Sequence, residues 1–226
     1  KKTTFYTELA YILGLLVLAF GTALMEQADF GVSMVVAPAY LLHLKVSEVL
    51  PFFSFGMAEY TFQAFLLVVT MIILRRVRFS YFFSLVTAVF YGFMLDGFMF
   101  LADLIGEVGS VMNVVVYVIG MLMCASGISL LFHTYLSPEA YELFVKEISG
   151  RYNIDIHKVK TVCDCASCLL SVLMSFAFFG LWHFEGIKWG TAVCALANGT
   201  LIALWTKTYE RFFVFKDGLP LKKYFS

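Results

Sequence analysis

The chain has 226 residues, of which 61% are hydrophobic and only 14% charged, and its formal net charge is zero. A typical soluble domain carries about 25% charged residues, so this chain has too little charge for a water-facing surface of its size. The neutral balance and the lack of a basic stripe argue against nucleic acid as a partner. These bulk properties indicate an integral membrane protein.

Six apolar stretches are each long enough to cross the hydrocarbon core of a bilayer as a helix, which takes about 20 residues. They are Tyr6–Met25, Phe53–Leu74, Ser80–Leu101, Val111–Phe132, Val162–Leu181 and Trp189–Trp205. No small-residue cleavage site follows the first stretch, so we expect it to remain as a span. The sequence therefore predicts an all-α, polytopic membrane protein with six transmembrane helices.

Two shorter segments follow the first and the fourth stretch. Phe30–Pro51 is too apolar for a simple loop and too interrupted to span the bilayer. Ser137–Tyr152 opens with Ser137-Pro138-Glu139, which is typical of an N-cap followed by proline at the first helical position. We expect each segment to form a short interfacial or re-entrant helix.

The distribution of Lys and Arg predicts the orientation, because these residues accumulate in cytoplasmic loops. With the N-terminus inside, only Lys45 and Lys188 of the sixteen Lys and Arg residues fall outside. The other fourteen are Lys1, Lys2, Arg75, Arg76, Arg78, Lys146, Arg151, Lys158, Lys160, Lys207, Arg211, Lys216, Lys222 and Lys223. We therefore predict that both termini are cytoplasmic.

Residues of the first half recur in the second half at a nearly constant offset of 105 to 107 positions. At an offset of 106, Tyr11, Gly14, Ala19 and Gly21 match Tyr117, Gly120, Ala125 and Gly127. At 105, Glu59 and Thr70 match Asp164 and Ser175; at 107, Ser84, Val86, Ala88 and Gly92 match Thr191, Val193, Ala195 and Gly199. This regularity predicts a duplication, with residues 1–108 as the first repeat and 109–226 as the second.

Each repeat holds three spans, so the second repeat must cross the membrane in the opposite sense to the first. Inverted repeats of this kind are typical of secondary transporters, whose binding site lies between the two halves. Duplication for packing alone is the alternative, since small residues let helices approach closely.

Polar side chains inside the spans give the candidate binding site, because ionisable groups in lipid are costly and face a protein interior or a watery path. Glu59 begins a polar helix face with Gln63 and Thr70, and Asp164 begins a matching face on the fifth span. The candidate substrate- or ion-binding residues are Glu59, Gln63, Asp96, Tyr91, Asp164, Cys168, Ser171, Asn198 and Glu26.

In the functional interpretation, Glu59 and Asp96 bind a cation or a proton from outside, and Asp164 forms the related inner station. In the alternative, Glu59 and Asp164 merely occupy the first turns of their helices, where the helix dipole favours an acid.

The five cysteines lie in apolar segments, and their odd number does not fit a disulfide framework. Cys163, Cys165 and Cys168 lie near Asp164, but residues two apart on a helix point about 200° apart, so the three thiols cannot converge on one ion. We expect reduced thiols that fill space, with no metal and no cofactor. No phosphate loop, zinc-protease pair or nucleophile elbow is present, so the sequence does not predict an enzyme.

The run from Gly21 to Ser33, GTALMEQADFGVS, resembles the opening signature of the YczE/YyaS/YitT-like bacterial membrane proteins. Gly190-Thr191-Ala192-Val193 and the span Phe79–Asp96 are similar to later elements of that family. The chain departs from the pattern at Met34-Val35-Val36, where a Pro-Trp-Asp-like element is usual. The resemblance implies a multi-pass protein of the bacterial cytoplasmic membrane, a transporter with no assigned substrate.

Together these features favour a small secondary transporter of a small solute, for which the acids suggest a cation and proton coupling. One alternative is the substrate-binding membrane subunit of a multi-component vitamin or metabolite importer, which would copurify with an ATPase module. Another is a membrane-embedded enzyme or assembly factor, for which no catalytic constellation is evident. The expected partners are the lipid bilayer, a small-molecule or ion substrate, and other copies of the chain in a homo-oligomer.

Overall fold

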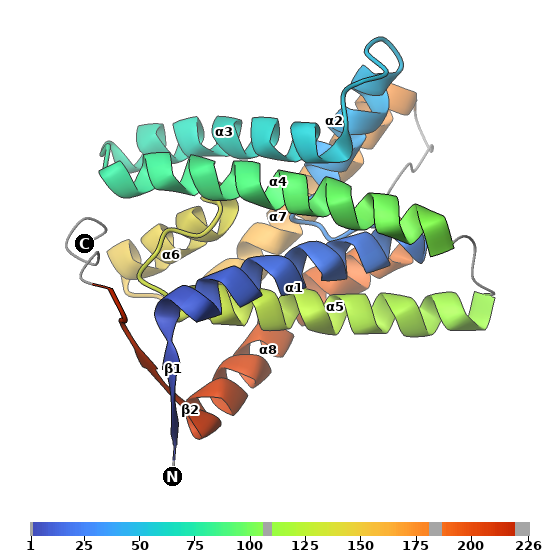
Figure 1. Cartoon of the computed structure of the whole chain (residues 1–226). Helices are drawn as coiled ribbons and strands as arrows, with labels where there is room; N and C mark the ends of the chain where they lie inside the picture. The colour runs from blue at the N-terminus through green and yellow to red at the C-terminus, as the bar shows by residue number, and fades with distance from the viewer. Residues whose placement is uncertain (1, 106–109, 181–186, 220–226) are drawn as a thin grey trace.

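A computed structural model describes residues 2–105, 110–180 and 187–219. The described residues form eight helices and two short strands (Figure 1). In chain order these are β1 (Thr3–Tyr6), α1 (Thr7–Gln27), α2 (Ala37–Ser47), α3 (Phe55–Leu74), α4 (Phe79–Ile105), α5 (Ser110–Phe132), α6 (Ala140–Tyr152), α7 (Ile156–Phe179), α8 (Trp189–Phe212) and β2 (Phe213–Lys216).

Six of these helices, α1, α3, α4, α5, α7 and α8, are long and apolar enough to cross a membrane. Each overlaps one predicted span, so the prediction of six helices that are long and apolar enough to cross a membrane is confirmed. The largest difference at a helix start is in α7, which begins at Ile156 rather than Val162, because the Asp155 carboxylate caps it by accepting the backbone N–H groups of His157 and Lys158. At the other end of the chain, α8 continues to Phe212 rather than ending at Trp205.

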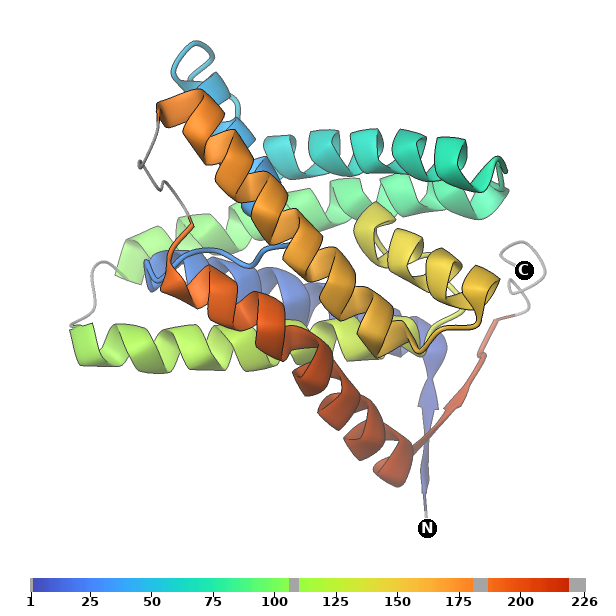
Figure 2. The same cartoon turned by 180° about the vertical axis from the view of Figure 1, so that it is seen from behind.

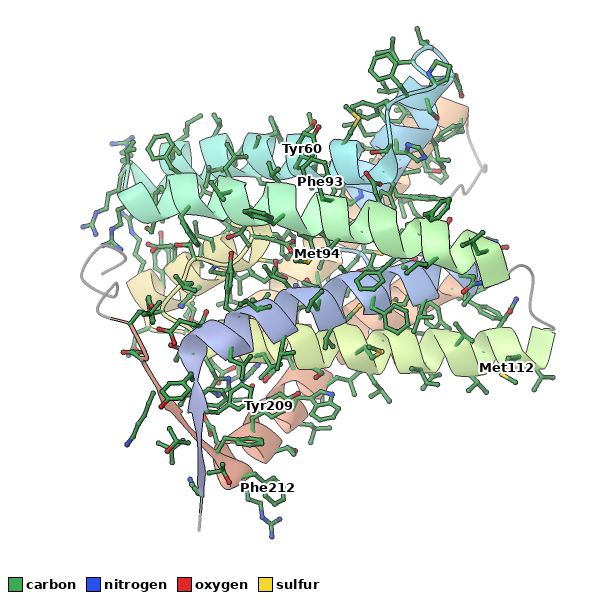
Figure 3. The ribbon with its side chains drawn as sticks, in the orientation of Figure 1. Tyr60, Phe93, Met94, Met112, Tyr209 and Phe212 are labelled. Carbon is green, nitrogen blue, oxygen red and sulfur yellow. The ribbon has the colours of Figure 1, made fainter. Side chains whose placement is uncertain are left out.

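Large apolar side chains cover the outer faces of the long helices. Phe93 on α4 is 68% exposed, and Met112 on α5 is 52% exposed (Figure 3). Such side chains would be costly in water and are at home in lipid, because burial of apolar surface is favourable wherever it is removed from water. The outside of the helix bundle is therefore suited to a bilayer.

The centre of the bundle is the antiparallel crossing of α1 with α5 (Figure 1). A Cβ atom on Gly14 would lie 3.1 Å from the Gly127 carbonyl oxygen, and one on Gly21 would lie 2.8 Å from the Gly120 carbonyl oxygen. The two main chains therefore touch at two levels, which only glycine permits.

The remaining helices pack around this crossing in pairs. Helix α4 contacts α1 and α3, and α8 contacts α5 and α7. Helix α2 contacts α3 and α7, and α6 contacts these two helices and also α4. The short helices α2 and α6 lie at opposite ends of the bundle (Figures 1 and 2). Strands β1 and β2 pair in parallel at the end that carries α6.

Irregular chain leads into each short helix: residues 28–36 form the first entry segment and residues 133–139 the second. Residues 31–36 and 136–139 are buried, as are the first residues of both helices. The short helices expected in Phe30–Pro51 and Ser137–Tyr152 are therefore present. The predicted cap at Ser137 is wrong, because the backbone stays extended through Glu139, which is the N-cap of α6.

Side chains of neighbouring helices hold the entry segments in place. The Thr191 hydroxyl donates to the Val32 carbonyl (2.8 Å), and the Ser167 hydroxyl donates to the Met34 carbonyl (2.7 Å). In the second entry segment, the Thr87 hydroxyl donates to the Ser137 carbonyl (3.0 Å). Buried irregular backbone requires such partners, because lipid and the apolar core offer none.

Candidate functional site

Eight polar side chains meet inside the protein where α3, α6, α7 and α8 approach one another. We call them the central polar cluster: Glu59, Gln63, Glu139, Tyr141, Glu142, Lys160, Asp164 and Asn198. Its five ionisable side chains other than the tyrosine are at most 1% exposed. Charged groups are almost never buried to this extent unless they are paired or serve a function.

Lys160 organises one side of the central polar cluster. Its ammonium nitrogen lies 3.0 Å from Glu142 Oε1, 2.9 Å from Asp164 Oδ1 and 4.4 Å from the centre of the Tyr141 ring. Asp164 also accepts the Tyr141 hydroxyl on Oδ1 (2.8 Å) and the Asn198 amide on Oδ2 (3.1 Å). Both oxygens of Asp164 are therefore satisfied.

Gln63 organises the other side. Its amide nitrogen donates to Glu59 Oε1 (2.8 Å) and to Glu139 Oε2 (3.2 Å). Its amide oxygen accepts the backbone N–H of Tyr141 at the start of α6 (3.0 Å), which fixes which way the amide points. Within the described part of the chain, Glu59 Oε2, Glu139 Oε1 and Glu142 Oε2 have no hydrogen-bond partner.

The cluster contains four carboxyl groups and one ammonium group. If every carboxyl were ionised, three negative charges would be uncompensated in a region of low dielectric, which is prohibitively costly. Burial, and then the neighbouring carboxyls of Glu142 and Glu59, raise the pKa of Glu139 well above its usual range. The cluster can therefore take up protons or a cationic group.

A small cavity adjoins the cluster on the side of α1. Its polar lining consists of Thr22, Ser33, Tyr91, Glu139 and Glu142, and its free volume is about 10 Å³, close to the minimum for one water molecule. The Tyr91 hydroxyl lies 2.9 Å from the Thr22 hydroxyl at its edge. Carboxyls from the second entry segment and α6 thus face a space bounded by the first half of the chain.

Five of the nine residues predicted for the site come together here. Glu59, Gln63, Asp164 and Asn198 belong to the central polar cluster, and Tyr91 lines the cavity. Helical spacing on α3 and α7 was the signal that identified the acids.

Asp96 lies apart, at the N-terminus of α3. Its Oδ1 accepts the Gly56 backbone N–H (2.8 Å) and its Oδ2 accepts the Ser54 hydroxyl (2.7 Å). The Ser54 hydroxyl in turn accepts the Met57 backbone N–H (3.1 Å), so the two side chains together cap the helix. This geometry accounts for an acid at this place without a ligand.

The other three predicted residues also lie outside the cluster. Ser171 is buried on α7 and donates to the Ser167 carbonyl one turn earlier (2.9 Å). Cys168 is half-buried against the apolar core. Glu26, near the end of α1, accepts the Tyr40 hydroxyl (3.4 Å).

Sequence reasoning missed Glu139, Glu142 and Lys160. The two glutamates lie within Ser137–Tyr152, for which the sequence predicts a short interfacial or re-entrant helix without singling out either acid, and Lys160 was counted among the cytoplasmic charges. The available signal was the apolar run Leu143-Phe144-Val145 directly after the two acids. Glu139 and Glu142 are three residues apart and lie on one face of the helix, so a helix start that is buried with this run also buries the two acids.

The cysteines do not form a metal site among the residues that the structure describes. All five thiols are free, and no group of three His, Cys, Asp or Glu side chains in the described ranges is arranged to hold a metal ion.

Comparison with known proteins assigns the chain to a family. The model described as "Family of unknown function (DUF6198)" matches residues 5–207. No curated protein and no solved structure matches the chain. The match covers nearly the whole length of the helix bundle, and the chain therefore belongs to this family of unknown function.

Proposed function

We propose that the protein is a small secondary transporter of a small cationic solute, coupled to protons, with the central polar cluster as its binding site. The observation that supports this most is the burial of four carboxyl groups with only one ammonium group among helices that could cross a membrane. Such groups in a membrane interior are characteristic of ion and proton paths.

We further infer that residues 1–108 and 109–226 are inverted repeats. The offset of 106 relates Gly14 to Gly120 and Gly21 to Gly127, yet the contacts are Gly14 with Gly127 and Gly21 with Gly120. That exchange is what a two-fold axis through the α1–α5 crossing would produce. The axis would lie in the membrane plane, because the two helices run antiparallel.

Hydrogen bonds to the entry segments support the same inference. Ser84 on α4 donates to the Pro138 carbonyl, and Thr191 on α8 donates to the Val32 carbonyl. Ser84 and Thr191 are related by the offset of 107, and Val32 and Pro138 by 106. The last helix of each half thus holds the entry segment of the other half.

The short helices give the proposal a mechanism. Helices α2 and α6 begin deep in the bundle and run outward to opposite ends, so their N-termini, with partial positive charge, lie near the centre (Figure 2). Broken helices that meet at the midplane between inverted repeats are a recurrent arrangement in transporters. Movement of one half against the other would expose the cluster to each side in turn.

The proposed location is the bacterial cytoplasmic membrane with both termini in the cytoplasm. Arg76, Arg78 and Arg151 lie at the end of the bundle that carries α6, and Lys45 lies on α2 at the opposite end. The excess of cations at the α6 end favours that end as cytoplasmic. Kinship with the YczE/YyaS/YitT-like proteins, which the opening signature suggests, would agree with this location.

The test is solute-driven current in proteoliposomes on a solid support, with a panel of monovalent metal ions and small organic cations and an imposed pH gradient. Wild-type protein should give a current with at least one panel member. Glu59→Gln and Asp164→Asn should reduce it by about tenfold or more, since each loss of about 1.4 kcal/mol in binding is a tenfold effect.

Glu48→Gln is the matched control, because Glu48, directly after α2, is an exposed acid that pairs with Lys45 and not with a residue of the cluster. It should leave the current unchanged. Absence of any wild-type current above that of protein-free liposomes, or undiminished current in both cluster variants, would contradict the proposal.

A further inference from the structure

The central polar cluster is unequal in its two parts. Lys160 contacts both Glu142 and Asp164 at 3.0 Å or less, and its single positive charge compensates one of their two negative charges. Glu59 and Glu139 share only the neutral amide nitrogen of Gln63, and neither contacts a cation in the described residues. If all four carboxyls were ionised, two of the three excess negative charges would therefore lie on this pair.

The position of the Gln63 amide argues against a metal ion between the two glutamates. Its oxygen is held by the Tyr141 backbone N–H, so its NH₂ group faces both carboxyls. Metal ions such as Na⁺ or Ca²⁺ need oxygen ligands at this place, and an NH₂ group presents hydrogens instead. The adjoining cavity has room for about one water molecule, which also leaves no space for a hydrated ion.

A proton fits the same place. Glu59 Oε2 and Glu139 Oε1 are both buried and unpartnered, and each can carry a hydrogen without displacing any contact. Glu139 also borders the cavity, where a water molecule could take the proton and pass it toward Glu142. The other titratable or charged side chains around the pair are Glu142 on α6, Lys160 on α7, Tyr91 on α4, Cys124 on α5 and Tyr11 on α1.

We propose that Glu59 and Glu139 together hold an exchangeable proton at neutral pH, while Lys160 acts as a tethered counter-ion that contacts Glu142 and Asp164. The pair is then the proton-coupling site of the transporter, and Lys160 holds the side chains of Glu142 and Asp164 in place. The coupling of this proton to transport rests on the proposed function. The protonation itself does not, because it can be measured without any substrate.

The measurement is infrared spectroscopy of the full chain in lipid nanodiscs at neutral pH, in H₂O and in D₂O. Wild-type protein should show the carbonyl stretch of a protonated, buried carboxylic acid, and the band should shift in D₂O. Glu59→Gln and Glu139→Gln should each remove intensity from it, and Asp164→Asn should not. Glu48→Gln is the matched exposed control and should leave the band unchanged.

A wild-type spectrum without this band, a band that does not shift in D₂O, or full intensity in both glutamine variants would overturn the proposal. Should the glutamine variants fail to fold, Glu59→Asp and Glu139→Asp keep the carboxyl and should move the band instead of removing it. A protein that shows the band but no solute current would keep this inference and lose the transporter; a current without the band would do the reverse.

Discussion

At the scale of single residues, Lys160 is the side chain on which the central polar cluster depends most. It is fully buried and contacts two carboxylates and an aromatic ring. Removing one partner of a buried ion pair leaves the other charge uncompensated, which costs more than the pair itself contributes.

We therefore expect Lys160→Met to lower the free energy of unfolding by about 3–5 kcal/mol at neutral pH. Adding Asp164→Asn should restore part of the loss, because it removes one of the two carboxylates left without a counter-ion. Chemical unfolding in detergent of the wild type and both variants checks this, and a double variant no more stable than Lys160→Met would refute it.

Asp96 is a residue whose role is local. Because it and Ser54 cap α3 together, Asp96→Ala and Ser54→Ala should each lower the free energy of unfolding by about 1 kcal/mol. The double variant should cost less than the sum, since both changes remove one shared cap. Unfolding curves of the three variants test this; full additivity would argue against a joint cap.

The residue scale is also where the sequence was least informative. Periodicity on α3 and α7 identified Glu59, Gln63 and Asp164, because each lies on one polar face of a long apolar helix. Glu139 precedes the short helix α6 and Glu142 lies in its first turn. Acids are common at this position in exposed helices, because they interact favourably with the helix dipole, so the local sequence does not distinguish a buried acid from an exposed one. The distinction comes only from the tertiary structure, in which the second entry segment is buried inside the bundle.

At the scale of elements, the glycine contacts explain why α1 and α5 are the most closely packed helices. The contact distances leave no room for even a methyl group on Gly21, whereas a Cβ on Gly97 of α4 would meet nothing within 4 Å. These two positions therefore form a matched pair, one in a crossing and one on an open helix face.

Gly21→Ala should lower the free energy of unfolding by about 1–3 kcal/mol, because the added methyl pushes two main chains apart. Gly97→Ala should raise it by up to about 1 kcal/mol, because alanine favours the helix and meets no obstacle. Thermal unfolding in detergent compares the two. Equal effects would show that helix propensity, and not the crossing, dominates at both positions.

The six long helices could be predicted because a helix that spans the bilayer needs about 20 apolar residues. The positions of the helix ends were harder to predict. The predicted span begins at Val162, whereas α7 begins at Ile156 and includes Lys158 and Lys160. Lys160 is buried there because Glu142 of α6 and Asp164, one turn further along α7, contact it. A charged residue can lie in a buried helix when another part of the fold supplies its partner. That partner lies outside the stretch of sequence from which the helix is predicted.

At the scale of the whole molecule, the arrangement predicts which loops face which side of the membrane. Lys45 on α2 and Arg76 after α3 lie at opposite ends of the bundle. In a chain whose native cysteines are replaced, a membrane-impermeant maleimide should label Lys45→Cys from outside intact cells and Arg76→Cys only after permeabilisation.

Leu169→Cys supplies the control, since Leu169 is 63% exposed on the middle of α7 and would face lipid. It should stay unlabelled under both conditions. Labelling of Lys45→Cys and Arg76→Cys from the same side would contradict the six-span arrangement. The sequence could predict this sidedness from its charges, but not which helices are neighbours, because contacts such as α1 with α5 join residues about 100 positions apart in the chain.

The pairing of β1 with β2 connects the segment before α1 to the segment after α8. Thr3–Tyr6 precede α1 and Phe213–Lys216 follow α8, and a ladder of backbone hydrogen bonds joins the two strands. The two halves are thus connected twice, once through the chain between α4 and α5 and once through this ladder. Any rocking that parts α1 from α8 at that end must either carry both strands as one body or unzip them. The ladder would therefore act as a latch, and slow exchange of those backbone amides that are hydrogen-bonded between β1 and β2 would report whether it stays closed.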